Sequence, residues 1–307
     1  MNVPGSRPSV SVVVPFAGAD HQLEAVLAAL RSLALTLAPG DEILLADNGP
    51  TGARAVPFPA SVRRVVAAGP RAAGAARNRG AAEARGEWLV FLDADARPRP
   101  GLLEAYFTPA PGPNTAVLAG GIRDTPSRDT RAARHSAGRG QMSQDRTLSR
   151  TGRPYAQTAN CAVRRVAFSA VDGFDAQARF GEDADLCWRL AAAGWGLEVR
   201  AGALVEHASR PTLAALLTQV AGHGAGAAWL ERRYPGEFPA PGARALARRC
   251  ARSAVNAGAG LSRGRRSEAA DAAIELLETL GFAVGRRLSN RPPDDSGRRL
   301  FGRGRWA

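Results

Sequence analysis

Two carboxylates, Asp93 and Asp95, stand one residue apart at the end of an apolar stretch of the sequence. Residues 88–95 read WLVFLDAD, and a turn rich in arginine and proline follows at once. Mg²⁺ and Mn²⁺ commonly bind one or two such carboxylates together with the phosphates of a substrate. An isolated Asp-x-Asp is more often an ordinary turn, because aspartate starts turns readily. The position directly after a predicted buried strand is therefore what favours a metal site.

A second acidic cluster, formed by Glu182, Asp183 and Asp185, follows a Phe-Gly pair and opens a helical pattern. Acidic residues are common in the first turn of a helix, where the helix dipole and the free backbone N–H groups favour them. Three acidic residues in four positions exceed what one helix cap needs. A carboxylate at the mouth of a cleft could instead serve as a general base that activates an acceptor hydroxyl.

Basic residues form a further group of candidates. Arg71, Arg77 and Arg79 cluster near the start of an alanine-rich segment, and a helix start there would also favour phosphate. The glycine spacing matches neither the dinucleotide fingerprint nor the P-loop. His207 stands alone after a predicted strand, and the pattern leaves open whether it is a metal ligand or a structural histidine.

The elements that must position these residues alternate between strand and helix. Apolar runs over residues 9–15, 42–46, 62–66 and 87–92 predict strands, and leucines spaced by three and four between residues 23 and 37 predict a helix. This alternation predicts an α/β protein with right-handed βαβ units and a mostly parallel central sheet flanked by helices. Ligands bind such sheets beyond the carboxyl ends of the strands, which is where Asp47, Asp93 and Asp95 fall.

The second half of the chain is less regular. Residues 123–153 are polar and rich in arginine, and they predict a mobile loop of the kind that often forms a lid. An amphipathic helix is predicted from residue 182 to about residue 193, and a strand over residues 196–207. From Pro211 onward the pattern is helical and interrupted by glycine.

The composition indicates a globular protein. The chain has 307 residues, 45% of them hydrophobic, and all 41 of its basic residues are arginine. The absence of lysine excludes a P-loop lysine and Schiff-base chemistry. Three widely spaced cysteines predict reduced thiols rather than a zinc cluster. No apolar leader and no run of 18 apolar residues is present, so the sequence predicts a cytoplasmic protein that could lie peripherally at the inner face of a membrane.

The net charge of +13 is concentrated near the end of the chain, where residues 244–307 hold 14 arginines and 6 acidic residues. We expect no nucleic-acid partner, because few aromatic residues stand among these arginines. A basic appendage fits a membrane surface or an anionic partner instead. Residues 269–288 predict a core-packing helix. The alternative is an interfacial helix that, with Arg286, Arg287 and the tail, meets an anionic membrane bearing a lipid-linked acceptor.

Five segments, taken in order, resemble the family 2 glycosyltransferases of the GT-A fold. They read SVVVPF, LLADNGPTG, AARNRGAAEARGEWLVFLDADARPRPG, NCAVRR and GFDAQARFGEDADLCWRLAAAGW. The resemblance covers about residues 9–207. It implies a catalytic domain over residues 1–210, with a nucleotide-sugar part at about 9–121 and an acceptor part at about 154–210. A helical, arginine-rich C-terminal extension would occupy residues 211–307.

The resemblance also implies roles for individual residues. The implied donor-nucleotide residues are Pro15, Phe16, Asp47, Arg77, Asn78 and Asp93. The implied ligands of Mn²⁺ or Mg²⁺ are Asp95 and His207, the implied catalytic base is Asp183, and Glu182 would contact the acceptor. The tip of the second strand reads Asp-Asn-Gly-Pro where the family usually has Asp-Asp-Gly-Ser, which leaves the donor base and the sugar open.

The predicted activity is the metal-dependent, inverting transfer of a sugar from a nucleotide-diphosphate donor, with a UDP-sugar favoured. The acceptor would be a hydroxyl, of a glycan or of a lipid-linked molecule, in glycan, cell-envelope or glycolipid biosynthesis. One rival is a catalytically inactive relative that still binds nucleotide sugars. A nucleotidyltransferase ranks lower, because the residues after the first strand, PFAGADHQ, lack the glycine-rich loop bearing lysine or arginine that such enzymes share.

Overall fold

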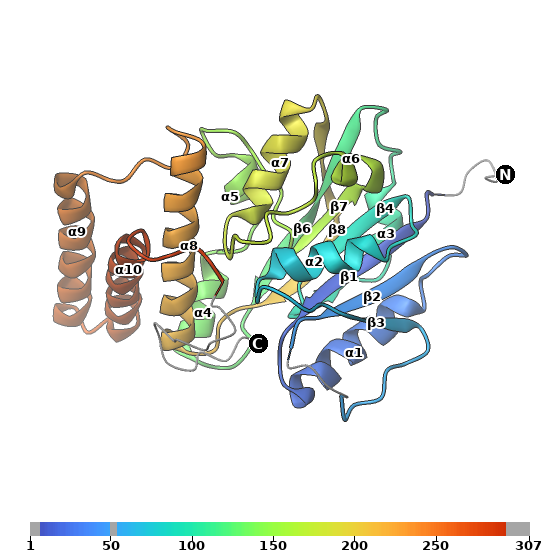
Figure 1. Cartoon of the computed structure of the whole chain (residues 1–307). Coiled ribbons are helices and arrows are strands. Elements are labelled where there is room, and N and C mark those ends of the chain that lie inside the picture. The colour runs from blue at the N-terminus through green and yellow to red at the C-terminus, as the bar shows by residue number, and fades with distance from the viewer. Residues whose placement is uncertain (1–6, 50–53, 293–307) are drawn as a thin grey trace.

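The computed structural model describes residues 7–49 and 54–292. Within these residues the core is an eight-stranded sheet of order β3-β2-β1-β4-β7-β6-β8-β5. Figure 1 shows this sheet with helices around it and with α8, α9 and α10 gathered at one side. The strands are β1 (Val10–Phe16), β2 (Glu42–Asp47), β3 (Val62–Val66), β4 (Trp88–Leu92), β5 (Ala96–Pro98), β6 (Thr115–Thr125), β7 (Asn160–Arg164) and β8 (Gly196–Ala208).

The sheet is parallel around β1 and mixed beyond β4. Strand β1 runs parallel to β2 and β4, and β2 runs parallel to β3. Strand β7 is antiparallel to β4 and β6, whereas β6 and β8 are parallel and β5 is antiparallel to β8. The strands predicted within residues 9–92 and 196–207 are confirmed. Strands β5, β6 and β7 were not predicted, because β5 has three residues and β6 is interrupted by Gly120 and Gly121.

Two hydrophobic cores lie on the two faces of the sheet, because successive side chains of a strand point in opposite directions. Val12 and Val14 pack with the leucines of α1 (Asp20–Ala34), whereas Val13 packs on the opposite face. Helix α2 (Ala73–Ala82) approaches that face closely at Gly80, where a Cβ atom would lie 2.5 Å from Cγ1 of Val13. The close approach brings Arg77, one turn earlier in α2, near the ends of the central strands.

The prediction of a loop over residues 123–153 was wrong in part, because helices α4 (Arg131–Gly138) and α5 (Asp145–Leu148) lie there. Helix α4 begins at a Thr130 cap, whose hydroxyl accepts a hydrogen bond from Ala133 N–H. The residues that α4 buries are mostly small, namely Ala132, Ala133, His135 and Ser136. Their low hydrophobicity conceals the helical period from a sequence analysis based on large apolar residues. The other helices of this part are α3 (Leu102–Tyr106), α6 (Arg165–Ala170) and α7 (Glu182–Ala192).

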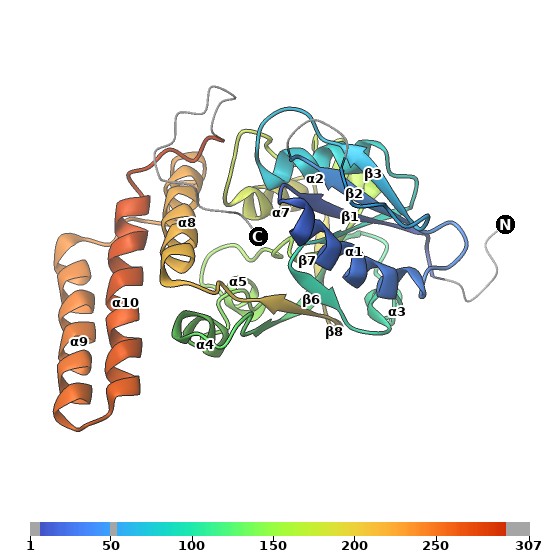
Figure 2. The ribbon, with the colours of Figure 1, turned by 90° about the horizontal axis from the view of Figure 1, so that it is seen from below.

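Three long helices end the described chain: α8 (Leu213–Arg233), α9 (Ala243–Ser262) and α10 (Arg266–Gly285). Figures 1 and 2 show α10 beside α8, with α9 on its outer side. Ile274 and Phe282 of α10 pack against Leu216 and Val220 of α8, as expected for a core-packing helix. Helix α9 buries only Ser253 and Gly260. Within the described ranges, we find no helix with the length and apolar character needed to cross a membrane.

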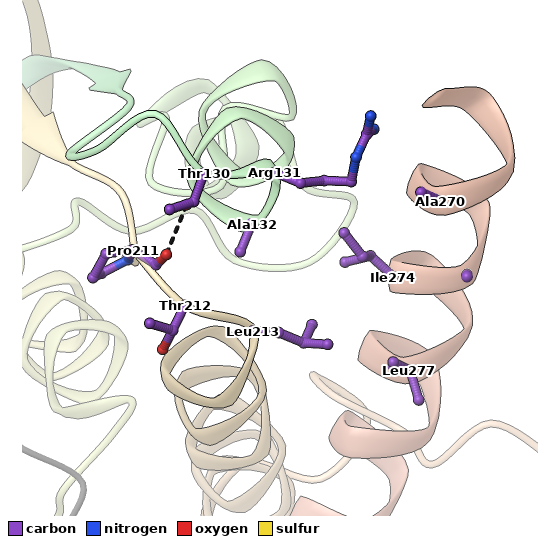
Figure 3. A pocket seen from close by; sticks show the side chains of 10 residues that line it. Thr130, Arg131, Ala132, Pro211, Thr212, Leu213, Ala270, Ile274 and Leu277 are labelled. Atoms are coloured by element: carbon purple, nitrogen blue, oxygen red, sulfur yellow. Dashed lines mark hydrogen bonds between the residues drawn. The ribbon is translucent and has the colours of Figure 1, made fainter. Parts of the chain in front are cut away.

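Helix α4 joins this C-terminal part to the rest of the molecule. A hollow of about 440 Å³ lies where α4, α8 and α10 meet, and its lining is mostly apolar (Figure 3). At its rim, the Thr130 hydroxyl donates a hydrogen bond to the Pro211 carbonyl across 2.7 Å. Farther along α4, the ring nitrogens of His135 lie 3.3 Å from carboxylate oxygens of Asp271 and Glu278 on α10. The segment predicted as a loop is therefore anchored to the C-terminal helices.

Candidate active site

A cleft of about 2360 Å³ opens beyond the carboxyl ends of β1 and β4. This is the edge at which parallel strands usually present a ligand site. The C-terminal helices also line the cleft, with Gln219 and His223 from α8. The sequence-predicted residues that the fold brings to this cleft are Pro15, Phe16, Arg71, Arg77, Asp93, Asp95, Glu182 and Asp183. Arg79 and His207 are not among the residues that line it.

Asp93, Asp95 and His207 form a cluster with the character of a metal site. Each offers one ligand atom, and these atoms all lie within 4.8 Å of one another. The strand pairing explains the cluster: β5 continues from the Asp-x-Asp turn and pairs with β8 so that Ala96 lies opposite His207. A residue 112 positions after Asp95 is thereby placed beside it.

The chemistry of the cluster fits a divalent cation. Nε2 of His207 is buried and forms no hydrogen bond with any described residue, although it lies 3.3 Å from Oδ1 of Asp95. A buried polar atom that forms no hydrogen bond costs free energy, and a coordinated cation would remove that cost. Two carboxylates and one imidazole are suitable ligands for Mn²⁺, and the carboxylates also suit Mg²⁺.

His207 is held from behind by Asp124 of β6. The other ring nitrogen, Nδ1, lies 3.2 Å from Oδ1 of Asp124, and a carboxylate in this position orients a metal-binding imidazole. Burial alone would lower the pKa of His207, but Asp95 and Asp124 raise it to about 10. A cation at Nε2 would compete with that proton. Sequence reasoning missed Asp124, because only the pairing of β6 with β8 brings it opposite His207.

Arg210 supplies a positive charge beside the cluster. Its Nη1 lies 3.0 Å from Oδ2 of Asp95. Burial would raise the pKa of Asp95, but His207 and Arg210 together lower it well below its ordinary value. Arg210 was not predicted as a site residue, although it stands only three residues after His207.

Arg77 connects the Asp-x-Asp segment to the second acidic cluster. Its Nη2 donates to Asp93 Oδ1 across 2.6 Å, and its Nη1 donates to Glu182 Oε1 across 2.9 Å. The neighbouring Asn78 does not line the cleft. Its amide group instead exchanges two hydrogen bonds with the backbone of Phe174, in the segment before α7. The role of Asn78 beside the nucleotide stays a prediction.

The start of α7 presents two neighbouring carboxylates to the cleft. Gly181 takes a left-handed conformation, with φ +81°, and begins the helix directly before Glu182 and Asp183. Burial raises the pKa of both carboxyl groups, and each is further raised by nearby negative charge, while Arg77 acts in the opposite direction. A carboxylate with a raised pKa can accept a proton at a pH closer to neutrality, as a general base requires.

Asp47 is placed differently from the other donor candidates. It lies at the end of β2, is 3% exposed and is not among the residues that line the cleft. Its carboxylate is bound by Arg54, by Arg64 and by the N–H of Gly49. Burial would raise the pKa of Asp47, but the bonds from Arg54 and Gly49 lower it. The next residue, Asn48, does line the cleft, and the contact of Asp47 with a donor base stays a prediction.

Comparison with known proteins decides the family. Residues 11–171 match the model described as glycosyl transferase family 2. The chain belongs to this family. The family 2 enzyme is 34% identical over 165 residues to the pre-mycofactocin glycosyltransferase of Mycobacterium tuberculosis, a match that covers 52% of this chain and 35% of the relative. The predicted family and the enzyme class, glycosyltransferase, are confirmed. The matched region spans about a third of the length of these curated relatives.

A solved structure confirms the GT-A fold of this family 2 glycosyltransferase. The mannosyltransferase PcManGT from Pyrobaculum calidifontis, in complex with GDP-Man and Mn²⁺, has a TM-score of 0.59 and 18% identity, over 90% of this chain and 87% of that one. A weaker likeness, with a TM-score of 0.46 and 19% identity, relates 79% of the chain to 88% of glucosyl-3-phosphoglycerate synthase from Mycobacterium tuberculosis. At such identities the likeness shows the fold alone.

Proposed function

We propose that this protein is a metal-dependent, inverting glycosyltransferase that uses a nucleotide-diphosphate sugar and a hydroxyl acceptor. The observation that carries the proposal is the joining of two sites within one cleft. Arg77 links the cation cluster at Asp93 to the base candidate's neighbour, Glu182. Because the chain belongs to glycosyl transferase family 2, we favour sugar transfer over nucleotidyl transfer as the reaction in this cleft.

The leaving group would be bound at the cluster. Asp95 and His207 would hold Mn²⁺ or Mg²⁺, with Asp93 toward the ribose. A bound cation stabilises the negative charge that develops on a departing diphosphate. Arg210 adds a fixed positive charge on the same side, 3.0 Å from Asp95.

Asp183 would act as the base. It takes the proton of the acceptor hydroxyl as that oxygen attacks the anomeric carbon, and Glu182 contacts the acceptor. Attack from the face opposite the leaving diphosphate inverts the anomeric configuration. The raised pKa of Asp183 supports this role, because the group then accepts a proton more readily than an ordinary aspartate.

We favour a UDP-sugar as the donor and place the acceptor in glycan, cell-envelope or glycolipid biosynthesis. The proposal includes contact of the C-terminal region with an anionic membrane that carries a lipid-linked acceptor. Exposed arginines of α9 and of the turn into α10 support this contact: residues 244–266 contain seven arginines and no acidic residue. The tail beyond residue 292 lies outside the described residues. Co-sedimentation with vesicles of anionic and of neutral lipid tests the contact, and equal sedimentation would contradict it.

The decisive test is a calorimetric titration of UDP, and of GDP for comparison, with and without Mn²⁺. We expect metal-dependent nucleotide binding that Asp95→Ala abolishes. Glu206→Ala serves as the control, because Glu206 lies on β8 near the site but pairs outward with Arg99. Nucleotide binding of equal strength with and without Mn²⁺ would contradict the role of the metal. Metal-dependent binding with no turnover of any nucleotide sugar would favour the inactive relative instead.

A further inference from the structure

The cleft carries more positive charge than the predicted donor site uses. Nine arginines and four carboxylates stand among its described lining residues. The four carboxylates are Asp93, Asp95, Glu182 and Asp183, which already belong to the metal and base sites. Two of the arginines, Arg146 in α5 and Arg150 just after it, lie on the side of α7, where the Arg150 guanidinium lies 5.5 Å from the centre of the Trp188 ring.

Arg146 of α5 is the key residue of that side. It is exposed, and the one hydrogen bond of its guanidinium within the described chain goes to the Arg139 carbonyl across 3.4 Å. No described carboxylate lies within ion-pair distance of it. Arg150, one turn later, is different, because Glu237 binds its guanidinium across 2.8 Å. Arg146 therefore brings an uncompensated charge to the cleft.

Contacts of Tyr155 connect α5 to the helix that begins at the acidic pair. Tyr155 N–H donates a hydrogen bond to the carbonyl of Thr147, the residue after Arg146, across 3.4 Å, and the Tyr155 ring lies 6.1 Å from the ring of Trp188 on α7. Arg146 and Asp183 both line the cleft. Burial is the main cause that raises the pKa of Tyr155, the charge of Asp183 raises it too, and Arg150 and Arg146 lower it.

 The pKa of His223 on α8 is lowered to about 4. Burial is the main cause, and the charges of Arg210 and Arg146 act in the same direction. His223 is consequently a neutral imidazole. Its ring lies edge-on to Phe180, with 5.7 Å between the ring centroids, and it forms no hydrogen bond within the described chain.

We propose that the acceptor is an acid whose carboxylate or phosphate binds to Arg146 beside His223, while one of its hydroxyls reaches Asp183. Hydrogen bonds between a guanidinium and an anion are stronger than those between neutral groups, and a partly desolvated cleft strengthens them further. The neutral His223 can donate one additional hydrogen bond to the same anion. This inference rests on the proposed function, because it takes Asp183 as the base that activates the acceptor.

Three small polyols test the inference, since they differ in the anionic group they carry. Glycerol is neutral, glycerate carries a carboxylate and glycerol 3-phosphate carries a phosphate. Binding is followed by saturation-transfer NMR on the full chain with UDP present in excess, so that a diphosphate already fills the donor side. Mg²⁺ replaces Mn²⁺ here, because Mn²⁺ is paramagnetic. The variant is Arg146→Gln, and Arg123→Gln is the control, an equal loss of charge on β6 outside the cleft lining.

We expect glycerate or glycerol 3-phosphate to bind and glycerol not to bind. Whichever anion binds more tightly identifies the carboxylate or the phosphate as the recognised group. Arg146→Gln should weaken that binding about tenfold or more, the loss expected for a hydrogen bond to a charged group. Arg123→Gln should leave it unchanged.

The inference is overturned if neither anion binds, if all three polyols bind equally, or if Arg146→Gln binds the anion as the unaltered protein does. UDP binding in the same samples separates this failure from that of the proposed function. A protein that binds UDP but no anion retains the proposed function and loses the acidic acceptor. A protein that does not bind a nucleotide at all contradicts the proposed function itself.

Discussion

Arg77 and Glu182 lie 105 positions apart in the sequence and are joined by an ion pair of 2.9 Å. The same guanidinium binds Asp93 across 2.6 Å, and its side chain is only 3% exposed. Because the pair is buried, its geometry is held more firmly than that of a surface ion pair. The Asp-x-Asp segment and the start of α7 are thus fixed relative to each other, which is what a reaction between a bound donor and a positioned acceptor requires.

Replacing Asp183 with asparagine should separate binding from catalysis. The substitution keeps the shape of the side chain but removes the proton acceptor, so we expect sugar transfer to fall by about 10²–10⁴-fold. Metal-dependent UDP binding should be nearly unchanged in calorimetry. Asp172→Asn is a matched control, because Asp172 is exposed and has φ 58°, a left-handed conformation that asparagine also adopts. Undiminished transfer in Asp183→Asn would remove Asp183 from the base role.

The rate of sugar transfer should fall on the acid side of the pH profile. A general base acts only when it is deprotonated, and burial raises the pKa of Asp183 above its ordinary value of 3.8. Activity should therefore be present above the raised pKa and be lost as the pH falls through it, well above pH 3.8. The profile is measured as kcat at saturating donor and cation, so that weaker binding does not enter. A rate that stays constant down to pH 4 would contradict the assignment.

Gly226 of α8 should be needed to position the base. A Cβ atom there would lie 2.8 Å from Cβ and 2.9 Å from the carbonyl atoms of Phe180, which precedes Gly181 and the acidic pair. Gly226→Ala should therefore displace the start of α7, lower the rate of transfer and reduce the free energy of unfolding by about 1–3 kcal/mol.

The control for this prediction is Gly258→Ala on α9, where an added Cβ atom meets nothing within 4 Å. Alanine in place of a helical glycine should stabilise the protein by about 0.5–1 kcal/mol there and leave activity unchanged. Equal activity of the two variants would show that α8 does not position the base.

His135 should make the attachment of α4 to α10 dependent on pH. Hydrogen bonding to Glu278 is the main cause that raises the pKa of His135 above 6.5, and Asp271 contributes in the same direction. The stabilisation is fully present below pH 6.5 and is lost as the pH rises through the raised pKa. His135→Gln should thus reduce the free energy of unfolding by about 1 kcal/mol more in acid than in alkaline solution.

Urea unfolding of both proteins at pH 5.5, about one unit below the ordinary histidine pKa of 6.5, and at pH 9.5, in alkaline solution, measures the difference. The exposed His21→Gln variant on α1 controls for loss of a histidine elsewhere. If the effect of His135→Gln is the same at both pH values, the histidine does not act through its charge.

The sequence was sufficient to predict the parts of the site that follow a local pattern. Asp93 and Asp95 end an apolar strand, and Glu182 and Asp183 open an amphipathic helix, so each pair could be located from its own neighbours. The alternation of strands and helices predicted the parallel half of the sheet for the same reason. The place of His207 near the end of a strand was also predicted, and it lies one residue before the end of β8, but its metal role rested on resemblance.

Contacts set by tertiary structure could not be predicted in this way. Asp124 lies behind His207 only because β6 pairs with β8, and β6 itself has no clear apolar pattern around its two glycines. His223 reaches the cleft because α8 packs against Phe180, just before α7, a contact that no local pattern specifies. Helix α4 was missed because it packs through small residues rather than through leucines.

The chain contains no lysine, so every positively charged side chain that lines the cleft in the described structure, its histidines aside, is an arginine. A guanidinium keeps its charge at any pH at which a protein stays folded, whereas a lysine amine can be neutralised by acetylation. Lysine acetylation is thus no means of reducing the attraction of this cleft for anions. Dissolved salt can still weaken it, because mobile ions screen charges that are exposed to solvent. Ionic strength, rather than covalent modification of amines, is accordingly the variable to which substrate capture by this enzyme should respond.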